Sequence, residues 1–354
     1  MNTKLQEILR LAIANKASDV HIIEGIVPKL RIKGQLIEVN NFSAENISQI
    51  SEMIFSTMVP ELKDKYKQEK ELDYSLELDD HRFRVNVYFQ QGKMAMSLRV
   101  IPGEIPTFEE LDLPDIFKSF VALKQGFVLV TGPTGMGKST TVASLLNEIN
   151  KQRSCHIVTI EDPVEYVIKP VSAIISQREV GFDTNSFSKA LRSSLRQDPN
   201  VVFVGEMRDL ETISTALTVA ETGHLVFSTL HTNSAAQTID RIIDVFDQKD
   251  QVRVQLASVV TAIISQRLIP TVDGLLTPAF EILVATPAVK NCIREGKTFM
   301  VDNIIQTSGD LGMVSLDYSL AKLVRQGKIS EEVAMTYSLK PNELQNNLRG
   351  IKGI

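Results

Sequence analysis

A glycine-rich run between an apolar segment and a helix-forming segment, at residues 126–150, most constrains what this chain can fold into. It matches the pattern G-x-x-x-x-G-K-[ST] at Gly132, Gly137, Lys138 and Ser139, and the strand-like segment Phe127–Val130 precedes it. In such a loop, backbone N–H groups and the positive end of the following helix hold phosphate, the lysine reaches the β- and γ-phosphate oxygens, and the hydroxyl binds Mg²⁺. A simple glycine-rich turn would leave the Lys138–Ser139 pair unexplained. We therefore predict a nucleotide site formed by Gly132, Pro133, Thr134, Gly135, Met136, Gly137, Lys138, Ser139 and Thr140.

The length of 354 residues favours two or more domains, because a single core rarely grows that large. A content of 43% hydrophobic and 23% charged residues is typical of a globular protein and excludes a disordered or fibrous chain. The net charge of −5 argues against a protein that coats nucleic acid, which needs a basic surface. Direct nucleic-acid binding is therefore not expected.

The two cysteines, Cys155 and Cys292, lie far apart in sequence, which excludes a four-cysteine zinc site. The first residues contain no apolar signal region, and the longest nearly apolar stretch, Leu256–Ile264, is too short to span a bilayer. We expect a cytoplasmic protein whose membrane contact goes through partners.

The pattern before residue 102 predicts an α+β domain. Apolar residues at helical spacing indicate a helix over Lys4–Ala17, and Ser43 is the expected N-cap of a second helix that ends near Ser56. Alternating segments predict an antiparallel sheet, with a hairpin turn at Lys33–Gly34; the strands are Asp19–Ile23, Lys29–Ile32, Gln35–Val39, Leu72–Leu78, His81–Gln90 and Lys93–Ile101. The predicted domain covers residues 1–101, and a linker at 102–120 contains Pro102, Pro106 and Pro114.

From Gly126 onward, strands alternate with helices, which is typical of a parallel sheet covered on both faces. The predicted strands are Phe127–Val130, His156–Ile160, Val201–Val204 and Leu225–Ser228, and the predicted helices are Lys138–Asn150, Phe187–Arg196 and Leu210–Glu221. This core is placed at 121–270. The remaining residues, 271–354, form a mostly helical subdomain; the predicted C-terminal helices are Gln251–Leu268, Pro287–Glu295, Val314–Arg325 and Ser330–Leu339.

Acidic residues follow two of the predicted strands. Glu206 follows Val201–Val204 and Gly205, where a carboxylate in a phosphate-loop enzyme binds Mg²⁺ directly or through water, or orients the attacking water. Glu161, Asp162 and Glu165 follow His156–Ile160, and Glu165 is the candidate general base. Asp162 is equally suited to a role in this chemistry and to capping the turn. Two acid clusters at neighbouring strand ends favour hydrolysis over binding alone.

Two of the five histidines, His224 and His231, flank one predicted strand. We expect His231 at the carboxyl end, near Glu206, where it can sense the γ-phosphate. His224 opens the strand at the opposite end. The two cannot share a metal ion, because they lie at opposite ends of an extended segment.

Arg82, Arg84 and Arg99 lie on strands of the N-terminal sheet. Such arginines usually form a solvated face. If the subunits form a ring, an arginine of one subunit can stabilise charge on the γ-phosphate of its neighbour.

Taken together, the motifs resemble those of the bacterial type II/type IV secretion and pilus ATPases. The diagnostic motifs of that superfamily occur in order, as GPTGMGKST at 132–140, IEDPVE at 160–165, VVFVGEMRD at 201–209 and HLVFSTLHT at 224–232. Within the superfamily, the chain looks like the pilus-retraction ATPases: the N-terminal domain is single and short, the tetracysteine module of the assembly ATPases is missing, and AVKNCIREGKT stands at 288–298.

The resemblance implies a PAS-like N-terminal domain, a RecA-like ATPase domain, and a homohexamer that hydrolyses ATP to power type IV pilus retraction at an inner-membrane platform protein. It also implies that Lys138 and Ser139 bind phosphate and Mg²⁺, that Glu165 is the catalytic base, and that Glu206 works with the metal and water. His231 and His224 would respond to nucleotide, and Arg84 and Arg99 match the arginines that act in trans.

Some alternatives remain open from the sequence. Lys290 and Cys292 depart from the usual signature AIRNLIRE, which leaves both the main motor and an accessory retraction paralogue possible. A pilus-assembly or type II secretion ATPase, a DNA-transfer motor and a nucleotide-binding ring subunit without hydrolysis are the other readings. A paralogous retraction or assembly ATPase is a further expected partner.

Overall fold

A computed structural model describes residues 1–32, 34–40, 42–79, 81–101 and 103–350. The chain forms two compact units: one comprises Met1–Glu104 with Glu165–Val167, and the other comprises Ile105–Val164 with Ile168–Ile354. The predicted turn residue Lys33 and the predicted linker residue Pro102 lie outside the described residues.

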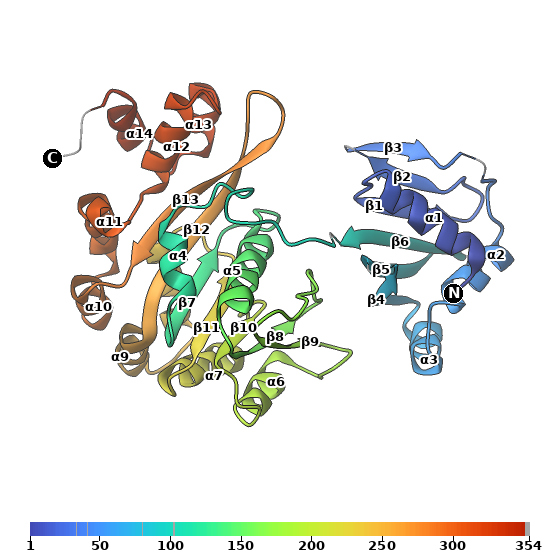
Figure 1. The fold of residues 1–354 in the computed structure, drawn as a ribbon, viewed down its shortest axis with the longest axis horizontal. Helices are drawn as coiled ribbons and strands as arrows, with labels where there is room; N and C mark the ends of the chain where they lie inside the picture. Colours follow the sequence, from blue (N-terminus) through green and yellow to red (C-terminus); the bar gives the residue numbers. More distant parts are fainter. Residues whose placement is uncertain (33, 41, 80, 102, 351–354) are drawn as a thin grey trace. The chain divides into compact units, whose positions relative to one another are not determined.

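The first unit is an antiparallel sheet that packs against helices (Figure 1). Its six strands lie in the order β3-β2-β1-β6-β5-β4. Its elements are α1 (Thr3–Ala14), β1 (Asp19–Ile23), β2 (Lys29–Ile32), β3 (Gln35–Glu38), α2 (Ile47–Phe55), α3 (Pro60–Glu69), β4 (Glu71–Leu78), β5 (His81–Gln90) and β6 (Lys93–Ile101). Alternate residues of β5, such as Phe83 and Val85, are buried against the helices. The predicted antiparallel α+β fold is confirmed.

The second unit is built on a seven-stranded sheet in the order β13-β12-β7-β11-β10-β8-β9. Its strands are β7 (Gly126–Thr131), β8 (His156–Glu161), β9 (Ile174–Glu179), β10 (Val201–Val204), β11 (Leu225–Leu230), β12 (Val260–Pro270) and β13 (Leu276–Val284). All neighbours pair in parallel except β12 and β13. Every residue of β7, β10 and β11 is buried, as expected for strands covered on both faces.

Helices cover both faces of this sheet (Figure 1). One core cluster joins the sheet to α4 (Ile116–Val121) and α5 (Lys138–Gln152). The cluster on the other face includes residues of α6 (Phe187–Ser194), α7 (Leu210–Glu221), α8 (Ala235–Asp244) and α9 (Lys249–Val259). The C-terminal helices are α10 (Pro287–Arg294), α11 (Val301–Thr307), α12 (Leu316–Arg325), α13 (Glu331–Tyr337) and α14 (Pro341–Leu348). The predicted α/β class is confirmed.

Two element predictions are wrong. The predicted helix Gln251–Leu268 ends at Val259, and β12 begins at Val260, because the β-branched run that starts there pairs with β7 on one side and β13 on the other. The N-cap of α2 is Asn46 rather than Ser43: its side chain accepts the N–H of Gln49, whose own side chain accepts the N–H of Asn46.

Candidate nucleotide site

The glycine-rich loop between β7 and α5 has a backbone that only glycines adopt easily. Gly132 has φ +139°, and a Cβ at this position would lie 2.2 Å from the carbonyl oxygen of Gln266. Gly137 has φ +75° and is the N-cap of α5, where no side chain caps the helix. The first N–H groups of α5 are therefore available to an anion at the loop.

Lys138 is buried at the start of α5, with 7% of its surface exposed. Its Nζ donates hydrogen bonds to the carbonyl oxygens of Gly132 at 2.7 Å and Pro133 at 2.8 Å. A buried ammonium requires such oxygen partners, and phosphate oxygens are of the same kind. The next residue, Ser139, is half-buried, and within the described residues its hydroxyl makes no hydrogen bond. The loop residues therefore fit a nucleotide phosphate and its Mg²⁺.

His231 follows β11 and lies between Lys138 and Glu206. Its Nδ1 is 3.4 Å from Nζ of Lys138 and 3.4 Å from Oγ1 of Thr134, and its Nε2 is 3.2 Å from Oε2 of Glu206. Because an ammonium only donates, Nδ1 must accept, and the ring proton then resides on Nε2 and is donated to Glu206. This arrangement connects the lysine of the glycine-rich loop to the carboxylate through one imidazole.

Glu206 lies just beyond β10 and is largely buried, with 14% of its side chain exposed. Its Oε1 is 2.5 Å from Nη2 of Arg208, whose side chain is 72% exposed. Two hydrogen bonds to the neighbouring strand fix this turn: the side-chain Oγ1 of Thr229 donates to the carbonyl of Gly205 at 2.6 Å, and the N–H of Met207 donates to the carbonyl of Thr229 at 3.1 Å. The carboxylate is held between an imidazole and a guanidinium, at the strand end predicted from the sequence.

Two residues of this site were not predicted from the sequence. Arg208 belongs to the motif VVFVGEMRD at 201–209, which does not by itself indicate a role for the arginine. Gln266, on β12, is 3% exposed; its Nε2 donates to the carbonyl of Met136 at 2.8 Å, and its Oε1 accepts from Thr141 Oγ1 at 2.7 Å. Gln266 therefore braces both sides of the phosphate loop. Gln266 falls within the predicted helix Gln251–Leu268, between the polar residues Ser265 and Arg267, so its place beside the phosphate loop could not be predicted.

The structure places the remaining predicted residues elsewhere. His224 precedes β11, where its Nδ1 lies 3.1 Å from the carbonyl of Val219 and 3.0 Å from Oγ1 of Thr222, at the opposite strand end from His231. Glu165 is exposed and follows β8, in the segment grouped with the first unit. Its role as base stays a prediction.

Arg84 and Arg99 pair directly across β5 and β6 in the first unit. Arg99 is 66% exposed in its side chain and donates to Oδ1 of Asp19 at 3.0 Å. Arg84 is half-buried and makes no ion pair within the described part of the chain. Both guanidinium groups lie on the sheet face opposite the buried Phe83 and Val85. Their action on a neighbouring subunit stays a prediction.

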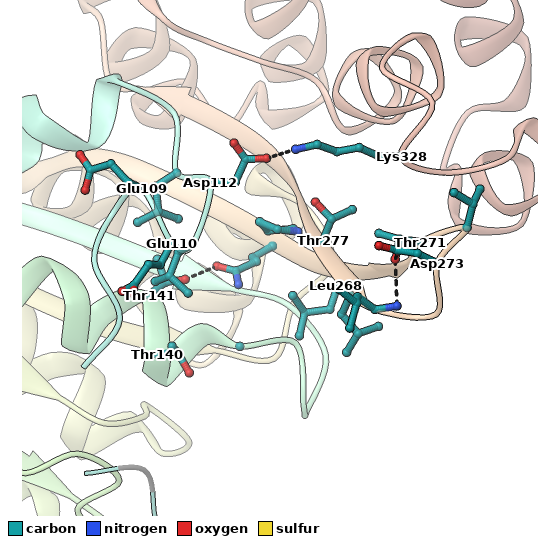
Figure 2. A pocket seen from close by; sticks show the side chains of 18 of the residues that line it. Glu109, Glu110, Asp112, Thr140, Thr141, Leu268, Thr271, Asp273, Thr277 and Lys328 are labelled. Atoms are coloured by element: carbon teal, nitrogen blue, oxygen red, sulfur yellow. Dashed lines mark hydrogen bonds and ion pairs between the residues drawn. The ribbon is translucent and has the colours of Figure 1, made fainter. Parts of the chain in front are cut away.

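A cavity of about 710 Å³ borders the phosphate loop (Figure 2). It is lined by Gly137, Thr140 and Thr141 on the loop side, and by residues 109–113 and the β12–β13 hairpin on the other sides. Four acids, Glu109, Glu110, Asp112 and Asp273, line it, and Asp112 forms an ion pair with Lys328. The acids disfavour phosphate there but suit the hydroxyls and amino groups of a nucleoside.

Among the helices of the described residues, none combines the length and the apolar character needed to cross a membrane.

Residues 1–314 match the model of the family described as Type II/IV secretion system protein. The type IV pilus retraction ATPase PilT of Pseudomonas aeruginosa is 45% identical over 333 residues, which cover 93% of this chain and 96% of that protein. The type IV pilus ATPase PilU of the same organism is 36% identical over 346 residues, which cover 97% of this chain and 90% of that protein. A crystal structure of the pilus retraction motor PilT with bound ADP superposes with a TM-score of 0.92, at 45% identity, over 98% of this chain and 100% of that one.

Proposed function

The chain belongs to the type II/IV secretion system protein family, and from this premise we propose that it is an ATPase motor that powers retraction of a type IV pilus. The observation that carries the proposal is the similarity to a pilus-retraction ATPase over nearly the full length of both chains. The connected residues Lys138, His231 and Glu206 supply the chemistry that such a motor needs.

The proposed substrate is ATP. Its phosphates bind the glycine-rich loop, where the N–H groups of α5 and the ammonium of Lys138 neutralise their charge. The nucleoside occupies the acidic cavity beside Thr140 and Thr141, which continues from the loop. The charges of the two regions set the orientation of the nucleotide: the cationic loop attracts the phosphates, and the carboxylates of the cavity favour the nucleoside.

For hydrolysis, Ser139 and Glu206 are the proposed ligands of Mg²⁺, with Glu206 acting in part through water. When bound, the metal neutralises charge on the phosphate oxygens. Glu165 is proposed to accept the proton of the attacking water. His231 donates its Nε2 proton to Glu206 and faces Lys138 with Nδ1, so a change at the γ-phosphate reaches the carboxylate through the imidazole. His224 supports the opposite end of β11.

We propose a homohexamer in which Arg84 and Arg99 of one subunit approach the γ-phosphate held by its neighbour. Loss of that contact on hydrolysis would release the first unit and drive the motor stroke. The expected partners are an inner-membrane pilus platform protein and a paralogous retraction or assembly ATPase. The proposed location is the cytoplasm, at the inner face of the membrane, with no direct contact to nucleic acid.

A second candidate is an accessory retraction ATPase, which the 36% identity to PilU over 97% of the chain supports. The higher identity of 45% to PilT favours the main motor. A pilus-assembly or type II secretion ATPase is less favoured, because the two cysteines cannot form a tetracysteine module.

Two measurements test the proposal. The purified protein should hydrolyse ATP, which a ring subunit without turnover would not do. A deletion strain should keep surface pili, present or in excess, but lose their retraction. Absence of pili in that strain would indicate an assembly role instead, and normal retraction dynamics would support an accessory one.

A further inference from the structure

Glu281 is a buried acid on β13 that the proposed reaction does not use. It is 7% exposed, and its Oε1 accepts a hydrogen bond of 2.7 Å from the backbone N–H of Ala235. Ala235 is the first residue of α8, so the carboxylate lies at the positive end of that helix. Burial raises the pKa of Glu281 to about 7.

The contact fixes one end of the short connection that carries His231. The chain leaves β11 at Leu230, passes through His231 and enters α8 at Ala235. Ser234 caps α8 by accepting the N–H of Gln237 at 3.2 Å, a contact made within the same segment. Glu281, in contrast, attaches this segment to another strand. The position of α8 against β13 therefore sets where the imidazole lies.

The same hairpin braces the other half of the site. Ser265 of β12 pairs directly with Glu281 of β13, and Gln266 follows Ser265 on the opposite face of the sheet. Gln266 holds the phosphate loop through Met136 and Thr141, while Glu281 holds the His231 segment. One β-hairpin thus fixes both halves of the nucleotide site relative to one another.

The groups that influence the charge of Glu281 come from the C-terminal helices. Asp302 of α11 and Asp317 of α12 oppose its ionisation, and Lys340 favours it. Asp317 is 2% exposed and accepts a hydrogen bond from Ser338, and the Lys340 ammonium pairs with Asp302 at 2.8 Å and Glu343 at 3.2 Å. On β12, Arg267 lies on the same face of the sheet as Glu281, two residue pairs along the hairpin.

The arrangement of these helices is therefore coupled to Glu281. They also attach directly to β13, since the N–H of Phe280 donates to Ser319 Oγ of α12 at 3.1 Å. A shift of α12 moves acids and the Lys340 ammonium relative to the carboxylate, and it moves the strand that bears it.

We propose that Glu281 is a positioning residue that couples the C-terminal helices to the nucleotide site: its charged carboxylate holds α8 against β13 and keeps His231 between Lys138 and Glu206. Loss of the charge, by protonation or by movement of Lys340, loosens the α8 start and reduces turnover. The inference rests on the proposed ATPase function.

The first test compares ATP hydrolysis by the full-length protein and its Glu281→Gln variant between about pH 6 and pH 8. The amide keeps the size and an acceptor oxygen but never carries charge, so kcat at pH 8 should fall about fivefold, with KM for ATP nearly unchanged. In the wild type, kcat should rise between pH 6 and pH 8 as Glu281 becomes charged. In the variant, this contribution to the rise should be absent. Unchanged kcat with an unchanged pH profile would overturn the proposal.

Asp317→Asn is the matched control, because it removes another buried acid of the same region that accepts from Ser338 instead of α8. Its kcat at pH 8 should match that of the wild type, and its rise in kcat should begin at lower pH, because Asp317 no longer opposes the ionisation of Glu281. An equal fall in kcat in both variants would show that any buried acid in this region matters for folding alone. That result would overturn a specific role for Glu281.

Hydrogen exchange of the segment 231–237 provides a readout that does not need activity. After correction for the intrinsic pH dependence, protection in the wild type should increase from pH 6 to pH 8, and Glu281→Gln should abolish the increase. If the wild type hydrolyses no ATP but shows this change, the proposed function fails while the positioning contact stands. Protection that is independent of pH in the wild type would overturn the contact itself.

Discussion

Lys138 is the residue on which we expect the proposed nucleotide binding to depend most. It is buried among the carbonyls of Gly132 and Pro133, which are also the start of the phosphate loop. Lys138→Ala should abolish measurable binding of ATP, because the β- and γ-phosphate charges lose their only cation within the loop sequence itself. Equilibrium binding of a fluorescent ATP analogue would check this. Affinity within about twofold of the wild type would contradict the assignment.

Glu206 and Glu165 are expected to act in turnover more than in binding. Glu206→Ala and Glu165→Gln should each retain ATP binding while hydrolysis falls at least about tenfold, the modest loss expected when an acid–base or electrostatic group is removed. Steady-state hydrolysis and binding, measured on the same preparations, separate the two effects. The control is Asp162→Asn, which neutralises an exposed acid close to Glu165 in the sequence. Wild-type turnover in the Glu165 variant would remove it as the base.

At the scale of elements, β12 determines the shape of the phosphate loop. A Cβ at Gly132 would collide with the Gln266 carbonyl, whereas a Cβ at Gly135 of the same loop meets nothing within 4 Å. Gly132→Ala should therefore abolish ATP binding while the fold persists. Gly135→Ala, with a φ of +79°, should cost only about 1 kcal/mol of loop strain. Circular dichroism and ATP titration test both variants. Equal affinities of the Gly132→Ala and Gly135→Ala variants for ATP would contradict the role of β12.

Most elements could be predicted because their apolar residues repeat at a helical or strand period. The predicted Leu210–Glu221 helix and the predicted Val201–Val204 strand match α7 and β10 at both ends. The end of α9 at Val259 could not be predicted, since the following residues become a strand only by pairing with β7 and β13. Local pattern does not reveal such long-range partners.

The candidate site was partly predictable for the same reason. Lys138, Glu206 and His231 follow predicted strands, and the carboxyl ends of parallel strands meet at one sheet edge. Gln266 and Glu281 belong to β12 and β13, which were not predicted as strands, so their contacts with the phosphate loop and α8 had no sequence-level signal. The convergence of side chains at the edge of the parallel core could be predicted, whereas the contacts made by the β12–β13 hairpin could not.

At the scale of the whole molecule, Glu281 links stability to pH. Its carboxyl pKa is about 7 in the folded protein, because burial disfavours the charge, against 4.5 when exposed. Between these values the folded state holds a proton that the unfolded state has lost, so this stabilisation is present below about pH 4.5 and disappears as pH rises through 7. The difference corresponds to at most roughly 3 kcal/mol.

Glu281→Gln should therefore melt at a higher temperature than the wild type at pH 8, although it hydrolyses ATP more slowly. The difference in melting temperature between the two proteins should be smaller at pH 5. Thermal unfolding followed by circular dichroism at both pH values measures this. The Asp317→Asn variant again serves as the comparison, since burial also raises the pKa of that carboxyl. A lower melting temperature of Glu281→Gln at pH 8 would contradict the assigned cause of the shift.

The proposed ring makes one further demand, because the phosphate loop and the arginines of the first unit would belong to different subunits. Rings made only of Arg84→Ala subunits should be inactive because no positive charge faces the γ-phosphate. Rings made only of Lys138→Ala subunits should be inactive because they bind no nucleotide. In a mixed ring, a Lys138→Ala subunit still presents an intact Arg84 to a neighbour whose loop is intact. Mixtures of the two inactive variants should therefore recover part of the ATPase activity, with a maximum at intermediate ratios. Absence of activity at every ratio, under conditions in which tagged subunits demonstrably exchange, would place the arginine and the nucleotide in the same subunit.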